Sequence, residues 1–593
     1  MRAVLPVVLL VLLVAVVGPV GAGAAPTDVP LCTPGGDTIV LDGLVAPEEA
    51  KTYRYLPFEV APGTTRVEVS YDWGDQDPVL AQEPQGGTVV DLGLWDADGL
   101  TGADAFRGWG GSRQGVISRD LPPVWVQADS ADRGFTPGHV EPGTWHVELG
   151  FGNVNRGGGT WHVEITCLDP VVGDPPPYEP VDPDHVAEPE AGWFHGDFHM
   201  HGFHSQPDGP TNDEVLANAR EAGVDIVVLS DYVTTRHHGE LGPDAAANLD
   251  LLVIPSREVI TYFGHANVLG ETPDVVDYRH GYEGVSLGDI QRRSVAAGAL
   301  FQVNHPTIFP EPAFTSFCRG CEFNLEDAID PSLVTTVEVL TGPIEVGLDF
   351  LGGPSGLPGI EQPFVQTALD FYEDLLLAGH HVAPVSGSDE KQVAGHGSSV
   401  TAVYAEELSR AAVFEALDAA TTYVRTRGVD GSPTIDVTAT SGDQEVGLGG
   451  TLVGDTGNMT IEVTGGQGQL AEVTRNGQPY LSLPVTGDPA TLTVPLQRSP
   501  DEGPLGTFHR VDLREPSGIR SVLSSAVFLA DALPGETTPD GTATPKPATT
   551  EAPAAPAADP DAPDEDGALA ATGGGAALGA AVALLLAAAL RRR

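Results

Sequence analysis

Alternating apolar and polar positions run through residues 30–169, and a period of two is typical of half-buried strands. Residues 66–70, Arg-Val-Glu-Val-Ser, are one such run, and Gly, Pro and Asp residues separate the runs. The tetrapeptide Trp-His-Val-Glu occurs at 145–148 and again at 161–164, with a turn rich in Gly and Asn between the copies. We expect the copies to be paired strands of one hairpin, in an N-terminal β-sandwich that spans 26–169.

The pattern changes in residues 192–430, where stretches with helical spacing alternate with short apolar runs. Each predicted helix leads into a predicted strand: 212–222 into 224–229, 289–297 into 299–303, and 367–378 into 382–385. This alternation is typical of βα units built around a parallel sheet or barrel. We therefore predict a central α/β domain here.

Residues 431–533 return to strict alternation, as in Thr-Ile-Asp-Val-Thr at 434–438, and predict a second, Ig-like β-sandwich. Residues 170–191 are rich in Pro and acidic residues, which favours an extended, semi-rigid linker. The predicted fold class is a multidomain protein with a central α/β domain flanked by two all-β sandwiches.

The first 25 residues have the composition of a signal peptide. Arg2 is followed by an apolar run over 4–17 and by small residues at 22–25, which is the usual order of charge, apolar segment and cleavage site. The alternative is a retained membrane anchor. We expect an exported protein.

The C-terminal residues have the composition of a second targeting segment. Residues 534–568 are rich in Pro, Ala, Thr and acidic residues, and we expect a disordered, wall-spanning linker. Residues 569–593 contain Leu-Ala-Ala-Thr-Gly, an apolar run and three Arg residues. This order resembles a sortase sorting signal that begins at Leu569. The resemblance implies that a sortase cleaves between Thr572 and Gly573 and joins the chain to peptidoglycan; the alternative is a plain membrane tether.

The net charge bears on the partners that we expect, and the cysteines bear on disulfide formation. The formal net charge is −54, which repels phosphate backbones, so we expect no nucleic-acid partner. Four cysteines in an exported chain allow disulfides. Pairing of Cys32 with Cys167 would join the first and last strands of the N-terminal domain. Cys318 and Cys321 have two residues between them, and form either a tight disulfide, which we favour, or half of a metal site.

Histidines and carboxylates follow the strands of the central domain. His199 and His201 alternate on a predicted strand, so both imidazoles point the same way and can bind one metal. The later segments contribute further candidate ligands: Glu258, His265, His305 and Asp389. Strand ends and the loops after them build the sites of βα barrels, so we expect these groups to converge. Imidazole with carboxylate suits zinc, manganese or iron, and two ions bridged by one carboxylate fit this set.

These segments resemble the polymerase-and-histidinol-phosphatase (PHP) superfamily, in particular its exported, carbaryl-hydrolase-like branch. The resemblance covers about 192–430 and is carried by GDFHMH (196–201), VDIVVLSDY (224–232), REVITYFGHANVLG (257–270), ALFQVNHP (299–306) and SGSD (386–389). It implies a distorted (β/α)7 barrel. It also implies that one metal is bound by His199, His201, Glu258 and Asp389, and that Glu258 bridges to a second metal bound by His265 and His305.

The chain departs from the PHP pattern at three positions. One is the acidic residue that normally follows the HxH motif closely, for which the candidate here, Asp208, comes later. Tyr232 and Lys391 stand where the family has histidines of a third metal, so we expect two metals rather than three. Lys391, beside Asp389, is a candidate to neutralise charge in the transition state or to protonate the leaving group. Asp231 is expected to orient a ligand. The candidates for substrate or a weaker third ion are His204, Asp208, Asp231, Tyr232, His237, His238 and His396.

These features together predict a cell-surface hydrolase that uses a metal-bound hydroxide on a small-molecule or cell-envelope substrate. A phosphoester leads by resemblance, followed by an ester, amide or carbamate. Two other hypotheses stay open: a non-catalytic adhesin with a degenerate PHP domain, and a protein that only sequesters metal.

Overall fold

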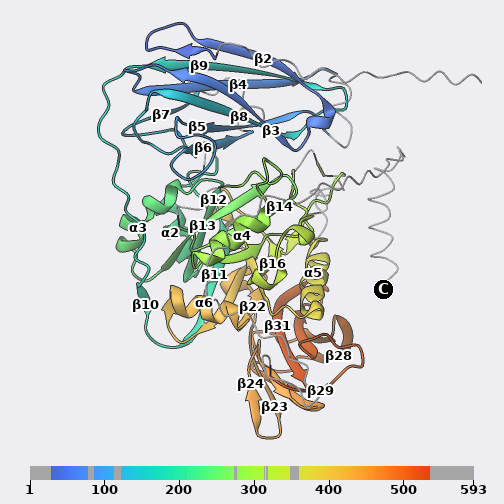
Figure 1. Cartoon of the computed structure of the whole chain (residues 1–593). Coiled ribbons are helices and arrows are strands. Elements are labelled where there is room, and N and C mark those ends of the chain that lie inside the picture. Colours follow the sequence, from blue (N-terminus) through green and yellow to red (C-terminus); the bar gives the residue numbers. More distant parts are fainter. Residues whose placement is uncertain are drawn as a thin grey trace, which may run out of the picture.

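The structure is a computed structural model, and it describes residues 29–77, 86–112, 122–206, 209–272, 277–312, 314–315, 318–347 and 359–533. The predicted signal peptide, the linker 534–568, the sorting segment with Leu569, Thr572 and Gly573, and Asp208 lie outside the described residues. In the part that is described, no helix has the length and apolar character needed to cross a membrane. Figure 1 shows the N-terminal strands stacked on the central domain, with the C-terminal strands on its opposite side.

The N-terminal domain is a sandwich of two sheets. One sheet has the order β1 (Leu31–Cys32), β3 (Thr52–Val60), β8 (Gly143–Asn153), β5 (Val89–Trp95) and β6 (Phe106–Gly111). The other has the order β2 (Ile39–Val45), β9 (Gly159–Leu168), β4 (Arg66–Asp75) and β7 (Val124–Gln127). A disulfide between Cys32 and Cys167 joins β1 to β9 across the sandwich.

The predicted hairpin of the two Trp-His-Val-Glu copies is wrong. The first copy lies in β8, which pairs with β3 and β5, and the second lies in β9, which pairs with β2 and β4. Trp145 and Trp161 are both buried in the core between the sheets. The copies thus meet across the core rather than side by side, because each strand turns its apolar face toward the opposite sheet.

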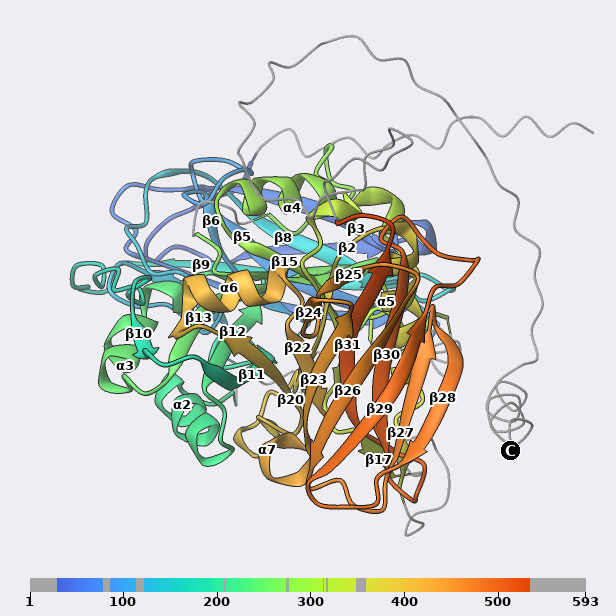
Figure 2. The ribbon, with the colours of Figure 1, turned by 90° about the horizontal axis from the view of Figure 1, so that it is seen from below.

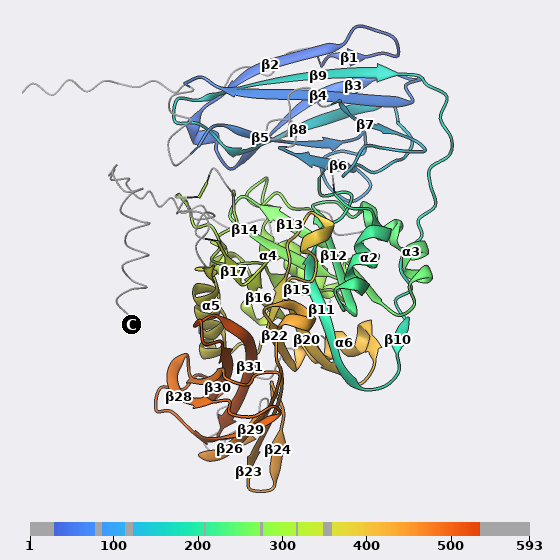
Figure 3. The same ribbon diagram turned by 180° about the vertical axis from the view of Figure 1, so that it is seen from behind.

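The linker after β9 runs down one side of the molecule to the central domain (Figure 3). Several contacts hold it there. The Glu179 amide donates to the Gly239 carbonyl over 2.8 Å. Strand β10 (Val186–Glu188) then pairs with β21 (Leu408–Ser409). The linker is therefore fixed against the domain that it leads to.

The central domain is built on a large mixed sheet. Its strands, in spatial order, are β19 (Ala383–Gly387), β16 (Thr336–Thr341), β15 (Leu300–Val303), β14 (Gly264–Leu269), β13 (Leu252–Thr261), β12 (Ile226–Tyr232), β11 (Gly192–Met200), β20 (Val400–Ala405) and β22 (Thr422–Arg425). Strands β11, β12 and β13 are mutually parallel, as are β15, β16 and β19, while β14 runs antiparallel between the two groups.

The expected (β/α)7 barrel is not found as a closed ring. Among the described residues, the ladder of paired strands is an open path that ends at β19. Beyond the end of β19, one parallel bridge joins Met200 to Glu390, and the Asp389 amide donates to the His199 carbonyl over 2.7 Å. Strand β14 is antiparallel, and the contact between β11 and β19 is short. The domain is therefore not a regular series of βα units.

Helices lie beside the central sheet. They are α2 (Asn212–Glu221), α3 (Leu241–Ala247), α4 (Leu287–Ala296), α5 (Val365–Ala378), α6 (Arg410–Asp418) and the short α7 (Gly428–Gly431). A capping box starts α2, in which the Thr211 hydroxyl accepts from the Glu214 amide. Gly379, with φ of 98°, ends α5 in the left-handed conformation that favours glycine.

The C-terminal strands continue the central sheet, so the predicted boundary at 430–431 is not a break between sheets. Strand β22 pairs with β31 (Arg520–Ala530), and the path goes on through β30 (Thr507–Arg514), β27 (Leu470–Arg475) and β28 (Gln478–Pro484), with β25 (Thr451–Val453) beside β31. A second sheet packs against it, in the order β24 (Gln444–Val446), β23 (Thr434–Ser441), β26 (Thr456–Thr464) and β29 (Ala490–Gln497). Figure 2 shows these two layers face to face.

Candidate metal centre

Polar side chains from the central strands converge at one edge of the sheet. The parallel strands all end at this edge, so residues at their C-terminal ends become neighbours. Strand β14 runs the other way, and its beginning lies at the same edge because His265 pairs with Ile260 of β13. The side chains gathered there are His199, His201, Glu258, His265, His305 and Asp389.

Four of these side chains surround one point, which we call metal position 1. The Nε2 atoms of His199 and His201 are 3.1 Å apart. Asp389 Oδ1 lies 2.9 Å from His201 Nε2, and Glu258 Oε2 lies 3.4 Å from the Nε2 atom of each histidine. The four ligand atoms are all within 4.8 Å of one another. Two imidazoles and two carboxylates at such spacing form a donor set for a divalent transition metal.

The other oxygen of Glu258 faces a second pair of imidazoles, which defines metal position 2. Glu258 Oε1 is 3.2 Å from His265 Nδ1 and 3.4 Å from His305 Nε2. The two rings lie edge to face, with centroids 5.3 Å apart. Glu258 therefore presents one oxygen to each position, as a carboxylate that bridges two ions must.

Hydrogen bonds on the far side of the rings fix the histidines of position 1. His199 Nδ1 donates to Glu338 Oε2 over 3.1 Å. His201 Nδ1 donates to Ser205 Oγ over 2.8 Å, and that hydroxyl donates in turn to Asp231 Oδ1 over 2.6 Å. Each ring thus uses Nδ1 as the donor and directs Nε2 toward the centre. Carboxylate–histidine pairs of this kind orient metal ligands and make them more basic.

Backbone carbonyls of one loop do the same at position 2. His265 Nε2 donates to the Arg319 carbonyl and His305 Nδ1 to the Cys321 carbonyl, each over 3.2 Å. The free nitrogens are then Nδ1 of His265 and Nε2 of His305, the two atoms that face Glu258. All four imidazoles therefore have one nitrogen held by an acceptor and the other directed at the centre, which is the orientation that a metal needs.

Burial and charge also fit a pair of cations. Glu258 is 1 % exposed, and its Oε2 has no hydrogen-bond partner among the described residues. Burial opposes ionisation of Glu258, but His199 and the neighbouring imidazoles hold its pKa well below the usual value. Burial likewise opposes ionisation of Asp389, and the charges of Lys391 and His199 hold its pKa below the usual range. A buried, ionised oxygen without a donor is costly unless a cation lies beside it.

The centre opens into a cavity of about 350 Å³, which is the size of a small-ligand site. One wall belongs to the central domain and carries Tyr232, Arg319 and Lys391. The opposite wall belongs to the N-terminal sandwich and includes Asp91 and Trp109. The N-terminal domain thus completes the cavity above the candidate centre.

Buried polar contacts hold the two domains together. Glu148 of β8 is 1 % exposed and accepts hydrogen bonds from Tyr55, Trp95 and Tyr278, of which Tyr278 belongs to the central domain. Burial raises the pKa of Glu148, which Arg279 of the central domain opposes. Such a network ties the sandwich to the wall of the cavity in one orientation.

Lys391, the residue predicted to neutralise charge in the transition state, lies beside Asp389 in the lining of the cavity. Lys391 donates to the Asp389 carbonyl over 2.7 Å and also to Asp389 Oδ1, and its ammonium lies 5.3 Å from the centroid of the Tyr232 ring. Burial lowers the pKa of Lys391, but Asp389 and Tyr232 raise it above the ordinary value. A lysine that holds its proton so firmly is suited to stabilising negative charge rather than to giving the proton away.

Four histidines that we considered for substrate or a third ion do not join the centre. His204 lines the cavity, but its Nε2 is 2.8 Å from Glu240 Oε2 and its Nδ1 accepts from the Gly134 amide. The other three bind carbonyls: His237 and His238 bind that of Ser256, and His396 binds that of Glu390. The structure uses these imidazoles to hold loops in place.

Sequence reasoning missed three contributors. Glu338 was not among the predicted ligands, although a Glu within the apolar strand Thr-Val-Glu-Val-Leu-Thr is itself a signal. Ser205 and Arg319 carry no pattern that distinguishes them from other loop residues. The roles of all three depend on which segments fold together.

Comparison with models of protein families gives no match, and neither does comparison with curated proteins. Among solved structures, the chain is similar to a two-domain protein from Bacteroides vulgatus containing a predicted PHP-like metal-dependent phosphoesterase, with 18% identity, a TM-score of 0.31, and coverage of 59% of this chain and 100% of that one. It is also similar to PsfC from Pseudomonas syringae (13%, 0.25, 38% and 87%). A third is the lesion-specific endonuclease PfuEndoQ from Pyrococcus furiosus (13%, 0.25, 38% and 56%). Likenesses this distant carry no argument about the activity of this chain.

Proposed function

We propose that this chain is a metal-dependent hydrolase of the PHP type with a centre for two divalent transition metals such as zinc, manganese or iron. Position 1 would be held by His199, His201, Glu258 and Asp389, and position 2 by His265, His305 and Glu258. One observation carries the proposal: each of the four imidazoles spends one nitrogen on an acceptor and turns the other toward Glu258 or Asp389. Isolated surface histidines do not show such a concerted arrangement.

Bound divalent ions supply Lewis-acid activation of water and of the attacked centre. The side chains of this protein supply the rest. Glu338 and the Ser205–Asp231 pair hold His199 and His201 in place. The Lys391 ammonium, at the cavity wall, supplies positive charge for an anion that develops during the reaction. Trp109, from the N-terminal domain, limits how a substrate lies over the centre.

The favoured substrate class is a phosphoester, and an ester, amide or carbamate is second. Lys391 and Arg319 both line the cavity, although the chain as a whole has a formal charge of −54. Cationic side chains in the lining of a cavity of so acidic a protein favour an anionic substrate group. The order of the motifs shared with the PHP superfamily supports the same class.

We place this activity outside the cell. The pattern of residues 1–25 supports export, and that of 569–593 supports attachment to peptidoglycan by a sortase. The substrate would then be a small molecule or a part of the cell envelope.

Metal analysis of the purified protein tests the proposal. We expect about two equivalents of transition metal, and loss of both in a His199→Ala, His305→Ala double variant. Protein reloaded with zinc or manganese should hydrolyse an aryl phosphate faster than aryl esters or anilides. If no metal is retained after reloading, the centre is not a metal site and the proposal falls.

A non-catalytic, adhesin-like protein is the second candidate, and one contact favours it. Lys391 donates to Asp389 Oδ1, the same atom that faces His201 Nε2. A lysine bound there competes with a metal for that oxygen. Absence of bound metal, even after reloading with zinc or manganese, would favour this second candidate. Full metal content with no turnover on any of the three substrate types would instead favour a protein that only sequesters metal.

A further inference from the structure

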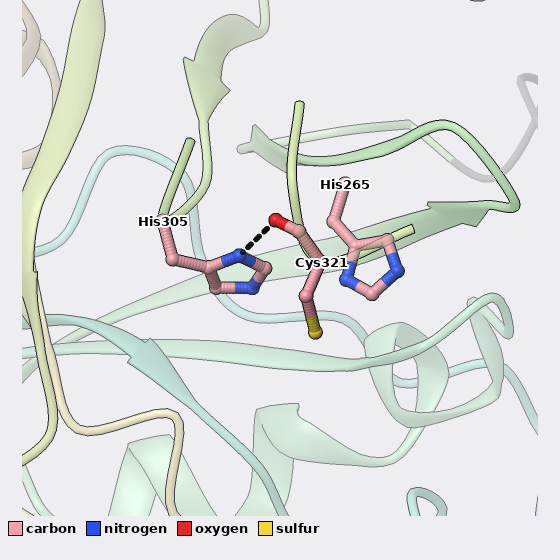
Figure 4. A group of neighbouring side chains, drawn as sticks. All are labelled: His265, His305 and Cys321. Carbon is pink, nitrogen blue, oxygen red and sulfur yellow. Dashed lines mark hydrogen bonds between the residues drawn. The ribbon is translucent and has the colours of Figure 1, made fainter. Parts of the chain in front are cut away.

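A disulfide lies directly beside metal position 2. Cys318 and Cys321 are paired, and the short loop that they close supplies the carbonyls of Arg319 and Cys321 that bind His265 and His305. Figure 4 shows Cys321 with its sulfur between the two imidazole rings. The sulfur and one nitrogen of each ring lie within 4.8 Å of one another.

A glycine allows this loop to lie close to the centre. Gly320, at the turn, has φ of 77°, and a Cβ built there would lie 2.3 Å from the Thr261 carbonyl oxygen. Only glycine fits this conformation and this approach to β13. Gly320 thus allows the loop to lie this close to β13, with Cys321 beside the histidines.

We propose that reduction of this disulfide turns Cys321 into a ligand of metal position 2. The inference rests on the proposed metal centre. A sulfur bound to another sulfur is no thiolate, so the oxidised protein offers position 2 two imidazoles and one carboxylate oxygen. The reduced protein adds a thiolate, a soft donor that zinc prefers. Three ligands then become four.

The chemistry balances with a dithiol as the reductant. The dithiol loses two hydrogen atoms and becomes a cyclic disulfide, while Cys318 and Cys321 gain them as thiols. Cys321 releases its proton when its sulfur binds the metal. Cys318 is half-buried and lines the cavity, so a small dithiol reaches it from the substrate side.

Four protein ligands close a tetrahedral ion, whereas catalytic ions keep a position open. The reduced protein should therefore bind zinc at position 2 more tightly, on the order of tenfold, and should hydrolyse its substrate more slowly. The oxidised state, which export favours, is the active one.

Cobalt spectroscopy on the full chain tests the inference, because a cobalt–thiolate bond absorbs in the near ultraviolet. The cobalt-loaded, oxidised protein should bind about two equivalents without this band, and dithiothreitol should make the band appear. Cys318→Ser leaves Cys321 as a free thiol and should show the band without reductant, whereas Cys321→Ser should never show it.

The outcomes separate the two proposals. Two bound equivalents with no new band on reduction would overturn the role of Cys321 and leave the metal centre standing. No cobalt bound by the oxidised protein would overturn the centre itself. A band that persists in Cys321→Ser would assign the sulfur to Cys318 and refute the inference as stated.

Discussion

Replacing Glu338 by Gln asks how much the groups behind the ligands contribute to metal binding. Glu338 is 0 % exposed, and its Oε2 accepts from His199 Nδ1 and from the His305 amide, each over 3.1 Å. Gln keeps the shape of the side chain but loses its charge. Its amide nitrogen would also take the place of Oε1, which has no hydrogen-bond partner among the described residues.

The expected loss follows from these two hydrogen bonds. A bond to a charged acceptor is about 1 kcal/mol stronger than one to a neutral acceptor, so two bonds lose about 2 kcal/mol. This corresponds to a roughly thirtyfold weaker affinity for metal, within the range seen when groups behind metal ligands are replaced.

Competition with a chromophoric zinc chelator measures the affinity directly. Glu462→Gln is a matched control, because Glu462 is exposed on β26, in the C-terminal strands. The control should bind zinc as the wild type does. If Glu338→Gln also binds both ions with unchanged affinity, while the double histidine variant binds none, then Glu338 does not orient His199 and our account of the ring orientations is wrong.

Three further substitutions test other parts of the molecule. Lys391→Ala should lower kcat on an aryl phosphate about a hundredfold with metal content unchanged, and a rise in KM alone would contradict a role in the transition state. Trp109→Ala should raise KM several-fold at unchanged kcat. The reason is that the Trp109 ring, 6.3 Å from that of Tyr232, forms the part of the cavity wall that comes from the N-terminal domain. Unchanged kinetics would show that the N-terminal domain does not shape the site. Burial and Arg475 lower the pKa of His509 from 6.5 to about 4, so the wild type should lose up to about 3 kcal/mol of unfolding free energy as pH falls from 6.5 to 4. His509→Leu should remove that part of the pH dependence in urea melts, and an identical slope in both proteins would refute it.

Local patterns carried much of the prediction. The helices α2, α4 and α5 lie within two residues of the predicted positions, because helical spacing and caps act over a few residues. The six candidate ligands were singled out from their positions at strand ends, and the structure brings all six together. A parallel arrangement makes strand ends meet, so the sequence was informative here without knowledge of the pairing.

Only the tertiary structure decided how distant segments meet. Strand pairing set the two Trp-His-Val-Glu copies in different sheets, and it merged the C-terminal strands with the central sheet. The N-terminal sandwich packs on the central domain so that Trp109 lines the cavity over the centre. The fold also brings Glu338 to His199, and it lets His204 and His237 bind other groups than the centre. Periodicity reports the face that a residue shows to its neighbours, whereas the identity of those neighbours depends on contacts summed over the whole chain. The sequence by itself therefore determined the elements and the candidate ligands, and the tertiary structure decided what orients them and what covers them.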